Sequence, residues 1–283
     1  MSVLVYIESE NNKFKKSSYE ALSYGKALAE KMGVKVSGLV INCSDAESLK
    51  AYGPDKILKI DSQDLNEFSS KKYAHAIADV IKSENADVVV LSSTPDSKYL
   101  GAHLSGITDS PFVSNVVELP ESINPFTVKR TCFTNKAFSL TELISDTKII
   151  SITSNSYGLI ENSNDSKTEE IDIKSIDSDQ RILNIEKESG SVTIADAEIV
   201  VSAGRGLKGP ENWGMIETLA ETLGAATACS KPVSDMGWRP HSEHVGQTGK
   251  PVSSNLYIAI GICLLYTSPS PRDRTRSRMP SSA

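Results

Sequence analysis

The residues with the clearest chemical potential are six consecutive ones, 204–209, which read GRGLKG and match the pattern G-x-G-x-x-G. A strand-like run at Glu198 to Ser202 comes directly before them, and a helix-like segment at Glu211 to Leu223 follows. In that setting glycines let the main chain approach a phosphate, and Arg205 adds a permanent positive charge. The pattern predicts a pyrophosphate site, and a tight turn with solvated basic side chains accounts for the spacing equally well.

The end of the next strand distinguishes between cofactors. A dehydrogenase that uses NAD has a carboxylate roughly 20 residues after the glycines, where it binds the ribose hydroxyls. In this chain Ser230 and Lys231 follow the strand-like run Ala225 to Cys229 instead. They suit a 2′-phosphate or a negatively charged cofactor better than NAD, and an ordinary surface lysine is the alternative.

A third segment, residues 245–250, reads VGQTGK and ends like a phosphate-binding loop. His244 stands where that loop needs its first glycine, and Pro251 replaces the serine or threonine, so a Walker motif is excluded. The segment still presents a hydroxyl, an amide and close main-chain N–H groups, which suit the edge of an uncharged ring. The residues concerned are Val245, Gly246, Gln247 and Thr248. A polar hairpin is the alternative interpretation.

Other reactive residue types have no supporting pattern. His241 and His244 flank Glu243, but two histidines without a third ligand are weak grounds for zinc, and His75 and His103 fit surface or packing roles. The cysteines show no metal or disulfide spacing, and no nucleophile elbow or pair of catalytic carboxylates is present. We predict no metal site and no catalytic residue.

The first half of the chain alternates strand-like and helix-like segments, which predicts a parallel sheet flanked by helices. The predicted strands are Val3 to Glu8, Val34 to Asn42, Ile57 to Ile60 and Asp87 to Ser92. Between them, apolar residues recur near helical spacing. The predicted core positions of these helices are Tyr19, Leu22, Ala27, Leu28, Met32, Tyr73, Ile77, Val80 and Ile81.

After Asp109 the alternation of strand-like and helix-like segments gives way to β-rich sequence. Three β-rich stretches predict that the sheet finishes in antiparallel strands. They are Val113 to Leu119, Val128 to Leu140 and Lys148 to Thr153. The polar stretch from Asn155 to Glu188 predicts loops and a linker. We therefore expect one domain over 1–190 and a second over 195–262, in which a strand at Leu256 to Ile262 follows the first βαβ unit.

Charge and hydropathy restrict the classes of function. The net charge is −6, and the tail at 272–278 holds +3 of positive charge, so the remainder carries −9. This acidity argues against broad nucleic-acid binding. Apolar runs are far shorter than the ~20 residues of a membrane helix. Strand-like sequence from Val3 leaves no room for a signal or transit peptide, which favours a bacterial cytoplasm.

Four segments together resemble the alpha subunit of electron transfer flavoproteins in order and spacing. They read AGRGLKGPENW (203–213), CSKPVSDMGW (229–238), HVGQTGK (244–250) and NLYIAIGI (255–262). The start VLVYIE and the run ADVVVLSST extend the resemblance over residues 1–262. It implies a fold of the α/β class, with an N-terminal Rossmann-like three-layer domain and a C-terminal doubly wound FAD-binding domain.

The resemblance also implies a site and a function. It puts Arg205, Ser230, Val245, Gly246, Gln247 and Thr248 at FAD-contacting positions, with Thr248 near the flavin N5 edge. Lys231 stands where many members carry arginine beside the flavin ring, and a cation there favours one-electron transfer. The implied protein is an electron carrier and no enzyme. It would accept electrons from acyl-CoA dehydrogenases, pass them to a membrane quinone oxidoreductase, and form a heterodimer with a beta subunit.

The final residues differ from the sequence pattern of that family. The pattern Ser-Gly-Ala-Ile-Gln-His is expected after Ile262, but this chain continues with Cys263 and a run of Ser, Pro and Arg. We interpret 263–283 as a non-native tail and predict a truncated FAD-binding domain that retains FAD weakly, because the small domain loses central strands. A native basic tail is the competing explanation.

The sequence also fits two alternative functions. The G-x-G-x-x-G turn and Lys231 also fit an NADP-dependent oxidoreductase, which would bind NADPH and show no flavin colour. A non-catalytic adenine-nucleotide-binding module could use the first domain alone. Neither alternative accounts for the HVGQTGK segment.

Overall fold

The computed structural model divides the chain into two compact units, Met1–Lys187 and Glu188–Ala283, called here the large and the small unit. The structure describes residues 1–10, 12–133, 135–173, 194, 197–246, 249–250, 252 and 254–262. The predicted domain boundary near 186–191 and the predicted tail at 263–283 lie outside these ranges.

The large unit is built on one sheet with the strand order β10-β9-β7-β11-β6-β1-β4-β5-β12. Its centre is parallel, because β1 pairs in parallel register with both β4 and β6. The strands are β1 (Ser2–Ile7), β4 (Lys35–Ile41), β5 (Lys56–Ile60), β6 (Val88–Ser92), β7 (Phe112–Val116), β9 (Phe126–Cys132), β10 (Ala137–Leu143), β11 (Lys148–Ile152) and β12 (Lys167–Glu170). Two short pieces, β2 (Ser9–Glu10) and β3 (Lys13–Phe14), pair with each other, and β8 (Ser122–Ile123) pairs with β9.

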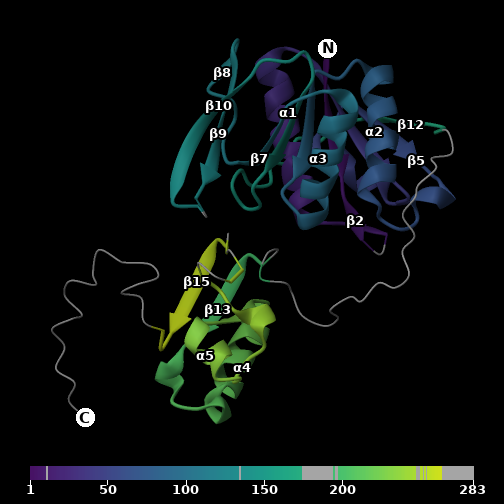
Figure 1. Cartoon of the computed structure of the whole chain (residues 1–283). Coiled ribbons are helices and arrows are strands. Elements are labelled where there is room, and N and C mark those ends of the chain that lie inside the picture. The colour runs from purple at the N-terminus through teal and green to yellow at the C-terminus, as the bar shows by residue number, and fades with distance from the viewer. Residues whose placement is uncertain are drawn as a thin grey trace. The chain divides into compact units, whose positions relative to one another are not determined.

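Helices cover both faces of this sheet, so the predicted three-layer α/β architecture is confirmed (Figure 1). The helices are α1 (Lys16–Met32), α2 (Ser70–Glu84) and α3 (Pro95–Thr108), with the 3₁₀ turns η1 (Ala46–Tyr52) and η2 (Gln63–Leu65). Alternate residues of β1 serve opposite faces: Val3 and Val5 pack in the cluster that holds α1, whereas Leu4 packs with α2 and α3. Burial on both faces explains why the strand is apolar throughout.

The end of the sheet differs from the prediction. Only β8, β9 and β10 are antiparallel, whereas β11 pairs in parallel register with both β6 and β7 and lies inside the sheet. The apolar residues Ile149, Ile150 and Ile152 of β11 are buried, and such a strand needs cover on both faces. The stretch predicted as Val128 to Leu140 is two strands, which a turn at Phe133 separates.

The predicted linker is partly structured. Strand β12 adds to the free edge of β5 in parallel register. Before it, Asn155, Tyr157 and Gly158 donate main-chain N–H groups to the buried carboxylate of Glu20 at 2.7–2.9 Å. The polar composition did not predict that this segment is structured, because hydrogen bonds rather than apolar packing hold it.

The small unit contains a three-stranded parallel sheet in the order β14-β13-β15. Its strands are β13 (Ile199–Ala203), β14 (Ala226–Cys229) and β15 (Leu256–Ile260), and its helices are α4 (Gly214–Leu223) and α5 (Lys231–Asp235). The 3₁₀ turns are η3 (Arg205–Leu207), η4 (Pro210–Asn212) and η5 (His241–Glu243). Val201, Ala203, Trp213, Ile216 and Val233 form its main core.

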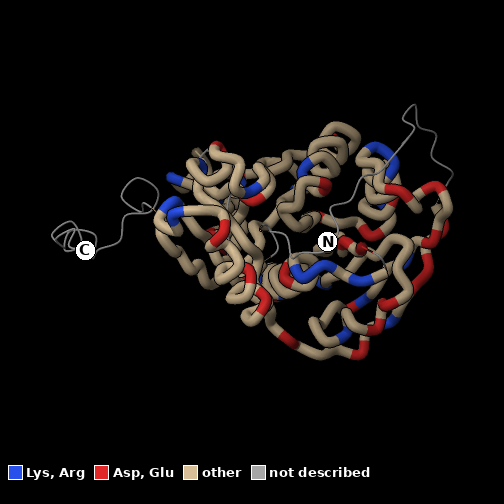
Figure 2. Tube along the Cα trace, turned by 90° about the horizontal axis from the view of Figure 1, so that it is seen from below, with Lys and Arg blue, Asp and Glu red and all other residues tan. Residues whose placement is uncertain are grey.

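Charged segments of both signs are interspersed along the Cα trace (Figure 2). No helix in the described part of the chain is long and apolar enough to cross a membrane. Among the cysteines that the structure describes, Cys43 and Cys229 are buried free thiols, whereas Cys132 is partly exposed.

Candidate cofactor site of the small unit

The carboxyl ends of three parallel strands meet at one edge of the small sheet. Gly204 follows β13, Ser230 follows β14, and Gly261 follows β15. The chain passes from the central strand β13 to β14 on one side, and later reaches β15 on the other side. The point between β13 and β15 is therefore a topological switch point, where open α/β sheets bind ligands.

The G-x-G-x-x-G turn packs directly on the chain that leaves β15. Gly204 N–H donates to the carbonyl of Ile260 at 3.0 Å, and Gly206 N–H donates to that of Gly261 at 2.9 Å. A Cβ atom on Gly204 would lie 2.4 Å from the Gly261 oxygen, and one on Gly206 would lie 2.6 Å from the Gly261 Cα. These glycines make room for another main chain, and the approach of a phosphate stays a prediction.

The helix after the glycines also differs from the prediction. The turn continues through η3 and η4 before α4 begins at Gly214, three residues later than expected. Asn212 fixes this passage, because its side-chain amide donates to the Leu207 carbonyl at 2.8 Å. Trp213 is buried next to it, with the Arg239 guanidinium 5.4 Å from its ring. Arg239 itself pairs with two carboxylates, those of Glu217 and Glu243.

The segment that begins at His244 lies beside the end of β14. His244 forms a parallel bridge with Cys229, and Val245 N–H donates to the Cys229 carbonyl at 3.0 Å. Lys250 N–H returns to the His244 carbonyl at 2.8 Å, which closes a loop. Val245 and Gly246 are consequently held close to Ser230. Gln247 and Thr248, which the sequence also predicts as site residues, lie outside the described residues.

The five described candidates therefore share one edge of the small sheet. Ser230 N–H donates to the carbonyl of Ala203 at 3.1 Å, which ties the end of β14 to the end of β13. The side chains of Arg205 and Lys231 are exposed, and Ser230 is half-buried. Two cations, a hydroxyl and main-chain groups form a donor set that suits a cofactor with negatively charged phosphates.

The histidines of this region lack a metal-binding arrangement. His244 is buried, whereas the ring of the exposed His241 lies 3.1 Å from the Ser234 hydroxyl. Burial lowers the pKa of His244, and the positive charges of His241 and Lys231 lower it further. Burial likewise raises the pKa of the Cys229 thiol to about 11. Among the described residues, no group of His, Cys, Asp or Glu side chains could hold a metal ion.

Two parts of this site could not be anticipated from the motifs. Gly261 was counted only as the end of a strand, although a glycine at that position signals a close approach of main chains. Arg239 and its two carboxylates had no motif at all. They became recognisable only when the fold brought residues 217, 239 and 243 together.

The fold and this edge define a class: a two-unit α/β protein whose small unit has the switch-point geometry of nucleotide-cofactor binding. Residues 3–178 match the family described as electron transfer flavoprotein domain, and residues 193–263 match the electron transfer flavoprotein FAD-binding domain. The chain therefore belongs to the electron transfer flavoprotein family, as an alpha subunit. Its cofactor is FAD, it is an electron carrier, and its family role implies a beta subunit as partner.

Curated relatives agree with this family. The chain is 28% identical to the electron transfer flavoprotein subunit alpha of Bacillus subtilis (strain 168), over 92% of this chain and 81% of the relative. It is 26% identical to Protein FixB of Clostridium saccharobutylicum, over 92% and 80%. It is 25% identical to the acryloyl-CoA reductase electron transfer subunit beta of Anaerotignum propionicum, over 92% and 81%.

The contact between the glycine turn and Gly261 gives a first prediction. Gly204→Ala should lower the free energy of unfolding of the small unit by about 2 kcal/mol, because the new methyl overlaps the Gly261 carbonyl. Both tryptophans of the chain, Trp213 and Trp238, lie in this unit, so their fluorescence during urea unfolding measures it. Gly214→Ala is the control, since its Cβ would meet no atom within 4 Å. Equal effects of the two substitutions would contradict the packing argument.

The buried His244 gives a second prediction. Because its pKa is lowered, the folded unit binds this proton less tightly than the unfolded chain does. The free energy of unfolding of the small unit should therefore fall as the pH drops through the ordinary value of 6.5, and level off below the lowered pKa. Tryptophan-detected unfolding at several pH values measures this, and His244→Gln should flatten the dependence. An unchanged dependence in that variant would assign the effect to another group.

Proposed function

We propose that the carboxyl edge of the small sheet binds FAD through seven residues. They are Arg205, Ser230, Lys231, Val245, Gly246, Gln247 and Thr248. The observation that carries the proposal is the convergence of the five described members after two neighbouring parallel strands, beside the switch point. Arg205 is suited to the pyrophosphate, because guanidinium groups bind phosphate oxygens in a fixed geometry.

Bound FAD supplies the electron-transfer chemistry, and the chain supplies position and charge. Lys231 provides a cation at the end of β14, which favours negative charge on a neighbouring ring. Lysine keeps the charge that arginine would supply but lacks its planar fork. Val245 and Gly246 offer main-chain groups on the loop that the Cys229 contact holds in place. No acid, base or nucleophile is needed for this function.

The proposal extends to the partners of the chain. We infer that the carrier accepts electrons from acyl-CoA dehydrogenases and passes them to a membrane quinone oxidoreductase, in a bacterial cytoplasm. The relatives reported above are all bacterial, and the name of one includes an acryloyl-CoA reductase, which supports that setting. In this proposal 1–190 forms the heterodimer and 195–262 binds FAD, while 263–283 stays a predicted non-native tail.

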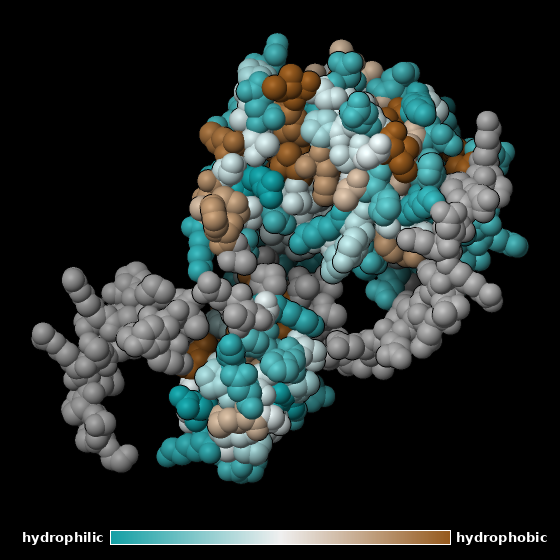
Figure 3. All heavy atoms as spheres, in the orientation of Figure 1, coloured by the Kyte–Doolittle hydropathy of each residue, from teal (hydrophilic) through white to brown (hydrophobic). Residues whose placement is uncertain are grey.

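The surface of the β9–β10 hairpin in the large unit is suited to binding a partner subunit. Four large apolar side chains on or beside it are exposed: Phe133, Phe138, Leu140 and Ile144. Figure 3 shows hydrophobic side chains over this part of the unit. Strand β10 ends the sheet order, so its outer edge has no strand neighbour among the described residues. An apolar edge strand of this kind invites cover by another chain, and we assign that role to the beta subunit.

The role of Arg205 can be tested on the heterodimer. Arg205→Ala should weaken FAD binding roughly 30-fold, because a charge-assisted hydrogen bond contributes about 2 kcal/mol. The measurement is a titration of FAD into the apoprotein co-expressed with its candidate beta subunit, followed by visible flavin absorption. Lys208→Ala, which removes an exposed cation from the same turn, should leave the affinity unchanged. If both variants weaken binding equally, only general charge attraction is involved.

A companion sample addresses the final residues. The same apoprotein with 263–283 replaced by a family-like C-terminus should bind FAD more tightly than the unaltered chain. An NADP-dependent oxidoreductase would instead bind NADPH and remain colourless in both forms.

The proposed subunit surface has its own test. Phe138→Ser should weaken binding of the beta subunit roughly 30-fold, since an exposed aromatic anchor buried on association contributes about 2 kcal/mol. The free chain should melt unchanged, because this ring is 64% exposed. Titration calorimetry with the beta subunit measures this affinity. Tyr99→Ser, at another exposed aromatic of the large unit, is the control and should bind normally. If the Phe138→Ser chain binds the beta subunit with unchanged affinity, the interface does not include this hairpin.

A further inference from the structure

The large unit has a switch point of its own. Strand β1 lies between β4, which follows it through α1, and β6, which comes later in the chain and leads into α3. The crevice outside the carboxyl ends of β1 and β6 is where domains of this topology bind nucleotides, with phosphates in front of a helix. Nothing in the proposed FAD site uses this crevice.

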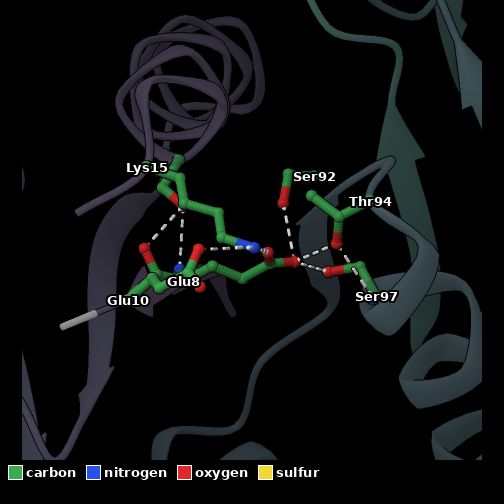
Figure 4. Close-up of polar contacts among 7 residues, drawn as sticks. Glu8, Glu10, Lys15, Ser92, Thr94 and Ser97 are labelled. Carbon is green, nitrogen blue, oxygen red and sulfur yellow. Dashed lines mark hydrogen bonds and ion pairs between the residues drawn. The ribbon is translucent and has the colours of Figure 1, made fainter. Parts of the chain in front are cut away.

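A buried glutamate occupies this position. Glu8 directly follows β1 and is 5% exposed. Its Oε1 atom accepts hydrogen bonds from three hydroxyls where β6 leads into α3, those of Ser92 at 2.9 Å, Thr94 at 2.5 Å and Ser97 (Figure 4). Residues 92–97 are called here the β6–α3 turn. Its Oε2 atom lies 3.5 Å from the Lys15 ammonium. Three hydroxyl donors and a lysine are the groups that a phosphate would require.

The main chain of Glu8 is held as firmly as its side chain. Its N–H donates to the Ser18 hydroxyl at 2.8 Å, and its carbonyl accepts from the Ser18 hydroxyl and from Lys15 N–H, each at 3.1 Å. Both partners belong to the start of α1. Glu8 therefore joins the β1–α1 turn to the β6–α3 turn, and the side chain cannot leave the crevice without breaking contacts with both.

The charges around the crevice oppose a further anion. Asp96 lies in the first turn of α3, and Glu10 lies 4.0 Å from the same Lys15 ammonium. Burial raises the pKa of the Asp96 carboxyl, the charges of Glu8 and Glu10 raise it further, and Lys15 opposes them. An incoming phosphate would meet three carboxylates and one ammonium.

We propose that the Glu8 carboxylate is the permanent internal ligand of the large unit's switch point. It takes the place of a nucleotide phosphate, satisfies the hydroxyls of the β6–α3 turn, and excludes nucleotides from this crevice. The large unit thus keeps a nucleotide-binding topology but uses the anion position to join two turns. This inference is independent of the FAD site.

Chemical rescue in the full chain tests the proposal. Glu8→Ala should melt roughly 10 °C lower than the wild type by far-UV circular dichroism, because the donors lose their carboxylate. Sodium formate should bind this variant saturably and restore much of the loss, while sodium chloride at equal concentration should not. Wild type and Glu10→Ala should show no formate-specific shift. Tryptophan fluorescence, which reports the small unit, should be the same in all three proteins.

A second variant keeps the test decisive if Glu8→Ala does not fold. Glu8→Gln fills the same space without the charge, so it should fold, melt several degrees below the wild type and resist rescue by formate. A Glu8→Gln chain as stable as the wild type would overturn the proposal. So would equal responses of Glu8→Ala to formate and chloride. Saturable stabilisation of the wild-type large unit by AMP, without a change in tryptophan fluorescence, would also overturn it and favour a nucleotide-binding module.

Discussion

Parallel pairing of neighbouring strands is the constraint on which both units depend. It brings the residues that follow different strands to one edge, however far apart they are in the chain. In the small unit this edge collects the glycine turn, Ser230 with Lys231, and the loop at Val245. In the large unit the same geometry brings Glu8 to the hydroxyls of the β6–α3 turn.

The two switch points carry opposite chemistry on related topology. The edge of the small unit exposes two cations, Arg205 and Lys231, and its glycines bring two main chains together. The crevice of the large unit already contains its anion, the buried carboxylate of Glu8. The fold therefore determines where a ligand could bind, whereas the side chains at that point determine whether one binds. The assignment of FAD to the small unit agrees with this difference.

Much of the architecture could be predicted because strands buried on both faces are apolar throughout and helices repeat every 3.6 residues. Four predicted strands of the large unit match β1, β4, β5 and β6 to within one residue at each end. The predictions failed where order comes from polar contacts. Residues 155–170 look like a linker but are held by the Glu20 carboxylate and by pairing with β5. The antiparallel ending holds for β9 and β10 but not for β11, since composition does not reveal that β11 inserts in parallel register beside β6.

By itself the sequence determined the family, the α/β class and the cofactor, because four segments resemble the family in order and spacing, and both family models match the chain. It also indicated which residues belong to the candidate site. Only the tertiary structure decided what several of them do: Gly204 and Gly206 make room for Gly261, and Glu8 fills the second switch point. Those roles depend on contacts between residues that are 57 or 84 positions apart, such as Gly204 with Gly261 and Glu8 with Ser92. Chain folding sets such distances, and no local pattern records them.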